Sequence, residues 1–408
     1  MKIKITLVLL FSSFLINAQK DAKRSGNLEG PENVEHQIEK RNHQKTLFEG
    51  PQSLQTYTQW KKDLKKKHGL SFGASAIMLY QNANNTTGSD CNALGGVYRF
   101  MGSWELVGRG TGHTGRLDIR VENRSNFSGF LAPSQLSGQV GMVPLNSGFA
   151  YSHNFKTDLA VFSWVQMFGN NSGGFAVGRL AFDVYLDPTA FQTFSRSFVN
   201  RAFILNASAP TTGIGALGAV VKGYVSEKIW LGGQIYDANA ASGSFDFETV
   251  KMNEWMRAFE VGFTPSRDRQ KQDKIQLSYW FKDARFAAGI PKGQGLLFST
   301  TYGVNPKLLT FFKFGTNDGG GGVAAKNTLS TGVEYKPQAY HAFAFAAGWA
   351  EPTAVLADKD EYAVELSYTA YLMRWISVMA DFQFLKNPTS NPSEDSAFVF
   401  GFRTIVNL

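Results

Sequence analysis

The C-terminal part of the chain alternates between apolar and polar residues, and this period of two restricts the fold more than any other feature. Residues 397–407 place Phe398, Phe400 and Phe402 on one face and Arg403 on the other, and residues 361–372 and 376–384 show the same pattern. Such alternation predicts β-strands whose two faces meet different environments. A strand of about 10 residues is long enough to cross a bilayer when tilted.

Further alternating segments occupy most of the chain, separated by turn signals rich in Asn, Gly and Pro. They include residues 98–109, 116–122, 179–186, 274–282 and 329–336. About 340 residues follow Gly69, enough for about 16 strands at roughly 20 residues for each strand and its share of loop. The predicted fold is therefore all-β: a transmembrane antiparallel β-barrel of about 16 strands over residues 69–408, wide enough for an aqueous lumen.

The segment before the barrel has a different character. Residues 1–18 combine two lysines with an apolar run and a small-residue end, which predicts a cleaved signal peptide and export to the outer membrane. Residues 19–68 form a polar segment, weakly structured to about Phe48, that ends in a short helix over residues 54–67 capped by Ser53 and stopped at Gly69. The only cysteine, Cys91, excludes an intramolecular disulfide, and a lipid anchor at the new N-terminus is not expected.

Motifs of catalysis are missing from the sequence. It contains no Gly-x-Ser-x-Gly elbow, no His-Glu-x-x-His and no phosphate-binding loop, so we expect neither an enzyme nor a cofactor or metal. The net charge of +8 is mild and not clustered as in a nucleic-acid-binding protein. Aromatic residues make up 14% and charged residues 18%, as expected when lipid-facing and lumen-facing residues alternate.

The predicted lumen face of the early strands carries charges of both signs two residues apart. Arginine forks and carboxylates can bind hydroxyl groups, and aromatic rings can stack on sugar rings. Tyr185, Tyr371 and Trp280 fall on predicted polar faces. We expect a substrate-binding constriction formed by Arg99, Arg116, Asp118, Arg120, Glu122, Arg179, Asp183 and Tyr185.

With these residues in view, the chain resembles the OprB-type carbohydrate-selective porins of Gram-negative bacteria over about residues 54–408. The most specific similarity is the closing block, with two long strands, the Asn387-Pro388 turn and a last strand containing Gly401 and Arg403. Residues 177–187, 198–203, 213–218 and 231–239 are also similar to family segments, as are residues 60–70. The chain differs in ending on Leu408 instead of an aromatic residue and in its longer polar segment, residues 19–48.

The resemblance implies a monomeric 16-stranded outer-membrane barrel through which sugars diffuse past arginines and acidic residues. It assigns that constriction to Arg99, Arg116, Arg120, Arg179 and Asp183. The implied partners are carbohydrate solutes, the lipid bilayer and the barrel-assembly machinery.

Two alternatives remain open. The same barrel, with its basic lumen, would select anionic solutes such as uronic-acid oligosaccharides or phosphate. A secreted β-protein, enzyme or adhesin, would have no pore, although its continuous apolar faces would not be tolerated in water.

Overall fold

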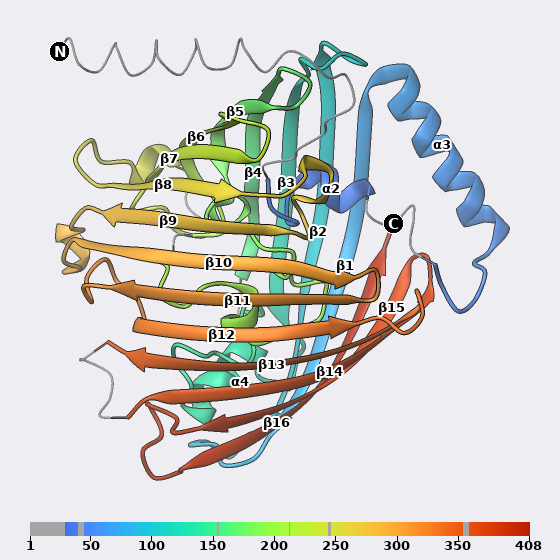
Figure 1. The fold of residues 1–408 in the computed structure, drawn as a ribbon. Helices are drawn as coiled ribbons and strands as arrows, with labels where there is room; N and C mark the ends of the chain where they lie inside the picture. The colour runs from blue at the N-terminus through green and yellow to red at the C-terminus, as the bar shows by residue number, and fades with distance from the viewer. Residues whose placement is uncertain (1–28, 40–44, 153–154, 212, 244–245, 354–358) are drawn as a thin grey trace.

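The chain folds into one closed barrel of 16 antiparallel strands in a computed structural model, which describes residues 29–39, 45–152, 155–211, 213–243, 246–353 and 359–408 (Figure 1). This confirms the predicted fold class. The strands are β1 (Leu70–Ala83), β2 (Asn92–Val107), β3 (Gly115–Asn126), β4 (Phe155–Phe168), β5 (Gly173–Leu180), β6 (Ala216–Tyr224), β7 (Ile229–Asp237), β8 (Trp255–Phe263), β9 (Lys274–Lys282), β10 (Gly293–Asn305), β11 (Leu308–Asn317), β12 (Ala325–Tyr335), β13 (His341–Pro352), β14 (Glu361–Met373), β15 (Ile376–Lys386) and β16 (Ser396–Asn407).

The first and last strands close the barrel. β1 pairs with β16 from Ser75↔Asn407 to Ala83↔Val399. In β16, Phe398, Phe400 and Phe402 point outward and are exposed, whereas Arg403 points inward and is buried. An apolar outer band on a closed barrel is the surface that a bilayer covers. Among the described residues, no helix combines the length and apolar character needed to span a membrane.

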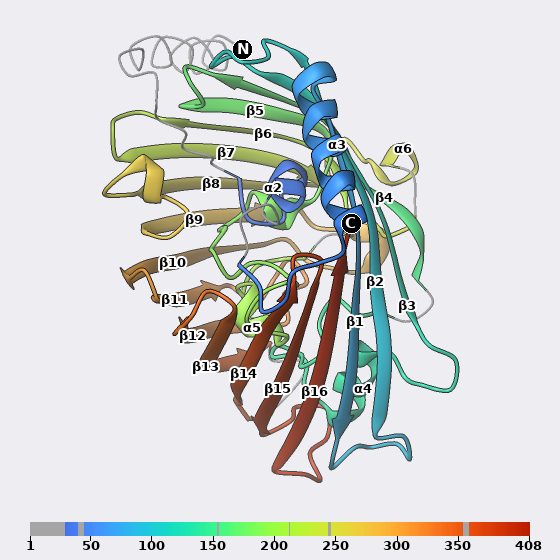
Figure 2. The same cartoon turned by 90° about the vertical axis from the view of Figure 1, so that its right-hand side faces the viewer.

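The connections differ in length at the two ends of the barrel. The turns after β4, β6, β10, β12 and β14 are short, whereas long segments follow β3, β5 and β7. Short turns face the periplasm in outer-membrane barrels. The first residues of β1 and the last residues of β16 lie at this same end. Here α3 (Gln52–His68) packs against the outside of β1 (Figures 1 and 2).

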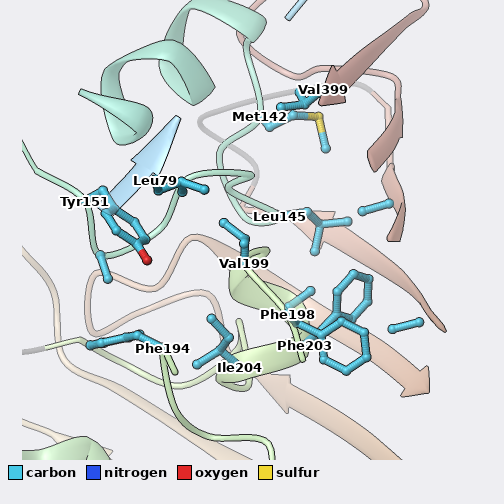
Figure 3. Close-up of a cluster of buried hydrophobic side chains, with 14 of the residues drawn as sticks. Leu79, Met142, Leu145, Tyr151, Phe194, Phe198, Val199, Phe203, Ile204 and Val399 are labelled. Atoms are coloured by element: carbon cyan, nitrogen blue, oxygen red, sulfur yellow. The ribbon is translucent and has the colours of Figure 1, made fainter. Parts of the chain in front are cut away.

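Two of the long segments fold into the barrel and fill part of it. One connects β3 to β4 and contains α4 (Pro133–Val140); the other, residues 181–215, connects β5 to β6 and contains α5 (Arg201–Ile204). We call residues 181–215 the inward loop. Its Phe198 and Phe203 pack in an apolar cluster with Leu145 and small residues on the inner wall (Figure 3). The barrel interior is therefore narrowed by its own loops.

Two local predictions were wrong. β5 ends at Leu180 because its partner strand β6 begins opposite it, at Ala216, so no ladder continues through residue 186. Phe182 is buried in the lumen and does not face lipid. Helix α3 begins at Gln52 with Pro51, not Ser53, at the N-cap, while its predicted end at Gly69 is confirmed by a left-handed φ of 72°.

The polar segment before α3 also differs from the prediction. Residues 34–39 form a helix, α2 (Val34–Glu39), which lies inside the ring of strands beside β1, β2 and β3 (Figure 2). Glu32, Asn33 and Val34 are buried there. The predicted signal peptide lies outside the described residues.

Candidate functional site

Arginines and carboxylates of β2 and β3 form a cluster on the inner wall. Alternation points these side chains inward on adjacent strands, where Arg99 lies opposite Glu122 and Ser103 opposite Asp118. Arg99 Nε donates to Glu122 Oε2 at 2.6 Å, and Arg116 Nε donates to Asp118 Oδ2 at 3.1 Å. Arg120 and Arg124 also pair with Glu122, at 3.7 and 2.6 Å. We call Arg99, Arg116, Asp118, Arg120, Glu122 and Arg124 the arginine cluster.

Residues 29–39, which we call the N-terminal segment, supply further carboxylates to this cluster. Glu32 accepts from Arg99 Nη1 at 2.8 Å, and Glu29 accepts from Arg116 Nη2 at 2.8 Å. Glu35 lies 3.4 Å from Arg116 Nη1. These glutamates were not predicted as site residues, and only Glu35 lies on α2, so no helical periodicity could have grouped them.

The predicted site residues are only partly brought together. Asp183 and Tyr185 lie in the inward loop, at a 3-10 turn over Phe182–Val184, and still reach the cluster region. Tyr185 donates its hydroxyl to Glu29 at 3.0 Å. Arg179 lies apart and pairs with Asp158 of β4 at 3.3 Å, and Asp158 also accepts from the backbone of Gly243. Asp158 therefore joins Arg179 to the segment after β7.

Burial and the arginines of the cluster together shift the pKa values of Glu32 and Asp183, two carboxyl groups that lie outside the strands. Burial alone would raise the pKa of Glu32, but the attraction of Arg99 and Arg120 outweighs it, and the pKa lies below the usual value. Burial raises the pKa of Asp183, against the attraction of Arg120. Glu32 is therefore held as a carboxylate, while Asp183 is easier to protonate.

On the wall formed by β11, β14 and β16, inward-facing polar side chains hold the inward loop. The two carboxylate oxygens of Glu365 accept from the backbone N–H groups of Val199 and Asn200, at 2.8 and 2.9 Å. Arg403 donates to the carbonyl of Phe198 at 3.1 Å, and Lys313 donates to that of Phe203 at 2.9 Å. These wall charges bind protein backbone, which the sequence did not indicate.

An open cavity of about 830 Å³ lies at the periplasmic end between the N-terminal segment, the inward loop and β9–β12. We call it the vestibule. Its basic lining residues are Arg196, Arg269, Lys271, Lys274, Lys307 and Lys336, and Glu29 and Glu334 are acidic. Tyr371 lines it, as expected of a lumen aromatic. Trp280, by contrast, is fully buried in an apolar cluster and does not line it, because Trp280 lies near the far end of β9, packed close to Gly321.

Arg201 is a second residue that the sequence analysis missed. Its guanidinium is about nine-tenths buried, lies over the ring of Phe149 at 5.6 Å, and forms no ion pair with any described residue. Burial lowers the pKa of Arg201 to about 10. It lines a small cavity together with Asp183, Asp187 and Asn206. An arginine with unused donors beside carboxylates is suited to binding a polar solute.

Within the described part of the chain, His, Cys, Asp and Glu residues form no group of three or more that could hold a metal ion.

Comparison with known sequences agrees with the closing strands. Residues 321–408 match the sequence model of the carbohydrate-selective porin family OprB. This region contains β12–β16, including the Asn387-Pro388 turn and the last strand. No curated protein matches the chain by sequence.

Solved structures match the barrel as a whole. The high-pH structure of Pseudomonas putida OprB matches with a TM-score of 0.67 and 14% identity, covering 86% of this chain and 97% of that one. OmpT of Vibrio cholerae, an outer-membrane protein in a loop-deletion form, matches with a TM-score of 0.51 and 12% identity, covering 83% and 99%. A mutant Rh. blastica porin matches with a TM-score of 0.53 and 11% identity, covering 83% and 100%. The resemblance predicted from the sequence is thus confirmed: the closing strands match the carbohydrate-selective porin family OprB, and the barrel has the fold of an outer-membrane porin.

Proposed function

We propose that the protein is an outer-membrane porin through which carbohydrates diffuse, and that it acts as a channel and not as an enzyme. The observation that supports this most directly is the match of the closing strands to the OprB family in a chain that folds as a complete barrel. Weak, repeated binding in a narrow lumen enriches a solute and still releases it.

The proposed path runs through the vestibule and past the inward loop. Tyr371 offers an aromatic face on which the CH groups of a sugar ring can stack. Farther along, Arg201, Asp183 and Asn206 offer donors and acceptors for hydroxyl groups. The arginine cluster lies on β2 and β3, close enough to Asp183 for Arg120 to attract its carboxylate. We propose that it shapes the constriction, together with Tyr185, while Arg179 supports the wall.

Single-channel recording of the mature protein in a planar bilayer tests this function. We expect stable conductance steps that neutral sugars block at millimolar concentration, and weaker block in Arg201→Ala. Arg257→Gln is the matched control because Arg257 lies on the outer side of β8, paired with Asp283. Conductance steps that no sugar blocks would contradict the carbohydrate assignment, and the absence of any steps would contradict the channel.

A second candidate is a channel for anionic solutes. The basic lining of the vestibule favours it, since six cationic residues face two carboxylates there. The reversal potential in a salt gradient distinguishes the two: strong preference for anions, without block by neutral sugars, would support the anionic cargo. The alternative of a secreted protein without a pore has no support in a closed barrel with an apolar outer band.

We further propose that the barrel functions as a monomer and reaches the membrane through the barrel-assembly machinery. The OprB resemblance supports the monomer, and the closed 16-stranded barrel supports insertion by this machinery. Cross-linking in native membranes tests the monomer, since a ladder of higher species would contradict it.

A further inference from the structure

The N-terminal segment is bound to the lumen by more than packing. Residues 29–39 lie inside the ring of strands beside the vestibule (Figure 2), and Glu32 and Gln37 are buried there. Buried carboxylates are costly unless they are paired. Both glutamates that contact the cluster closely have such partners: Glu32 pairs with Arg99, and Glu29 pairs with Arg116 and Tyr185. The segment thus occupies a site built for its charges.

The backbone of the segment is also held by the inward loop. Gly30 donates its N–H to the carbonyl of Val184 at 2.8 Å. A Cβ atom on Gly30 would lie 2.9 Å from that carbonyl oxygen and 2.9 Å from Cβ of Pro188. No side chain fits between the two without a shift. Gly30 therefore permits the close approach that brings the neighbouring glutamates to the arginines.

The segment changes the charge that a solute meets. Without it, the four arginines of the cluster face two strand carboxylates, Asp118 and Glu122. Glu29, Glu32 and Glu35 raise the carboxylates to five. The N-terminal segment thus converts a cationic wall into one without an excess of positive charge. Local charge in a pore sets its preference for anions or cations, so this change alters the selectivity.

We propose that Glu29, Glu32 and Glu35 are selectivity-determining residues of the channel. The N-terminal segment supplies them as a built-in ligand of the arginine cluster. By neutralising the cluster and filling the lumen beside it, they reduce the passage of anions and leave the path to neutral solutes. This inference rests on the proposed channel function and explains how a barrel with an arginine-rich wall would favour sugars over anions.

Two variants separate charge from shape. Glu29→Gln/Glu32→Gln/Glu35→Gln removes the three charges, whereas Gly30→Val keeps every charge and blocks the close approach. Glu49→Gln is the matched control, because Glu49 lies in the same N-terminal region and is exposed. Each mature protein is recorded in a planar bilayer under a potassium chloride gradient. Circular dichroism and resistance to SDS verify that the barrel has folded.

We expect both variants to shift the reversal potential toward that of chloride and to raise the conductance above that of the wild type. Glu49→Gln should behave as the wild type. A synthetic peptide of residues 29–39, added from the periplasmic side, should restore the wild-type conductance of Gly30→Val, whereas the peptide with three glutamines should not.

The outcomes separate this inference from the function on which it rests. If the wild type forms channels that sugars block, and both variants keep its conductance and reversal potential, the selectivity role of the glutamates is wrong and the porin function stands. If the wild type forms no channels, both are wrong.

Discussion

Glu365 holds the inward loop in place, and its removal should release the loop without opening the barrel. Glu365 is fully buried on the inner face of β14, and Glu365→Ala leaves the N–H groups of Val199 and Asn200 without their acceptor. A buried donor without a partner costs about 1–3 kcal/mol, so two of them cost about 3 kcal/mol or more. A change of about 3 kcal/mol raises the population of the released loop by about 100-fold.

Limited trypsin digestion of the folded barrel measures this release, because Arg196 and Arg201 lie in the inward loop. We expect cleavage after these residues to accelerate in proportion to the released population, while the unfolding midpoint of the barrel changes little. Leu366→Ala is the control, since Leu366 is the neighbouring lipid-facing residue. Equal cleavage rates in Glu365→Ala, Leu366→Ala and the wild type would refute the argument that Glu365 anchors the loop.

Three further predictions concern the lumen. Arg99→Ala should destabilise the barrel by about 3 kcal/mol in denaturant unfolding, because the buried Glu32 loses its 2.8 Å ion pair and keeps only Arg120 at 4.0 Å, while Glu122 keeps Arg120 and Arg124. The half-exposed Arg257 should contribute less than about 1 kcal/mol, and equal losses would contradict this prediction. Tyr371→Ala should weaken sugar block by about 5–10-fold in single-channel recordings, and unchanged block would remove Tyr371 from the path. Since the pKa of Glu32 is lowered from 4.5, the N-terminal segment should stay bound above pH 4.5 and be released, with rising conductance, as the pH falls below it. The charged groups that face Glu32 are Arg99, Arg120, Glu122 and Asp183, and the two arginines keep it ionised at neutral pH. Release of the N-terminal segment already near neutral pH would contradict this prediction.

The strands of the second half were predictable because both of their faces have a uniform environment. Phe398, Phe400 and Phe402 alternate with inward residues throughout β16, and lipid requires every outward position to be apolar. The same argument failed after Leu180. Phe182 and Val184 also alternate with polar residues, but their apolar surroundings are other parts of the lumen. An alternating pattern therefore does not show whether its apolar side chains contact lipid or other apolar residues inside the barrel.

The candidate site was predictable on β2 and β3 and not elsewhere. Arg99, Arg116 and Arg120 lie on the predicted inner face, because strand periodicity alone decides their direction. Arg179 lies directly opposite the lipid-facing Phe162 in the β4–β5 register, so its predicted place on the inner face is wrong, and its carboxylate partner Asp158 lies on the preceding strand. Which charge pairs with which depends on strand register and on the loops, and neither follows from spacing along one strand.

The amino-acid sequence by itself determined the barrel, its approximate strand number and the inward direction of the arginines on β2 and β3, since these follow from local periodicity and chain length. Only the tertiary structure decided what occupies the lumen. Glu32 meets Arg99 across 67 residues of chain, and Glu365 meets Val199 across 166. Such contacts form only when the barrel closes and brings distant segments onto one inner wall, so no local pattern records them.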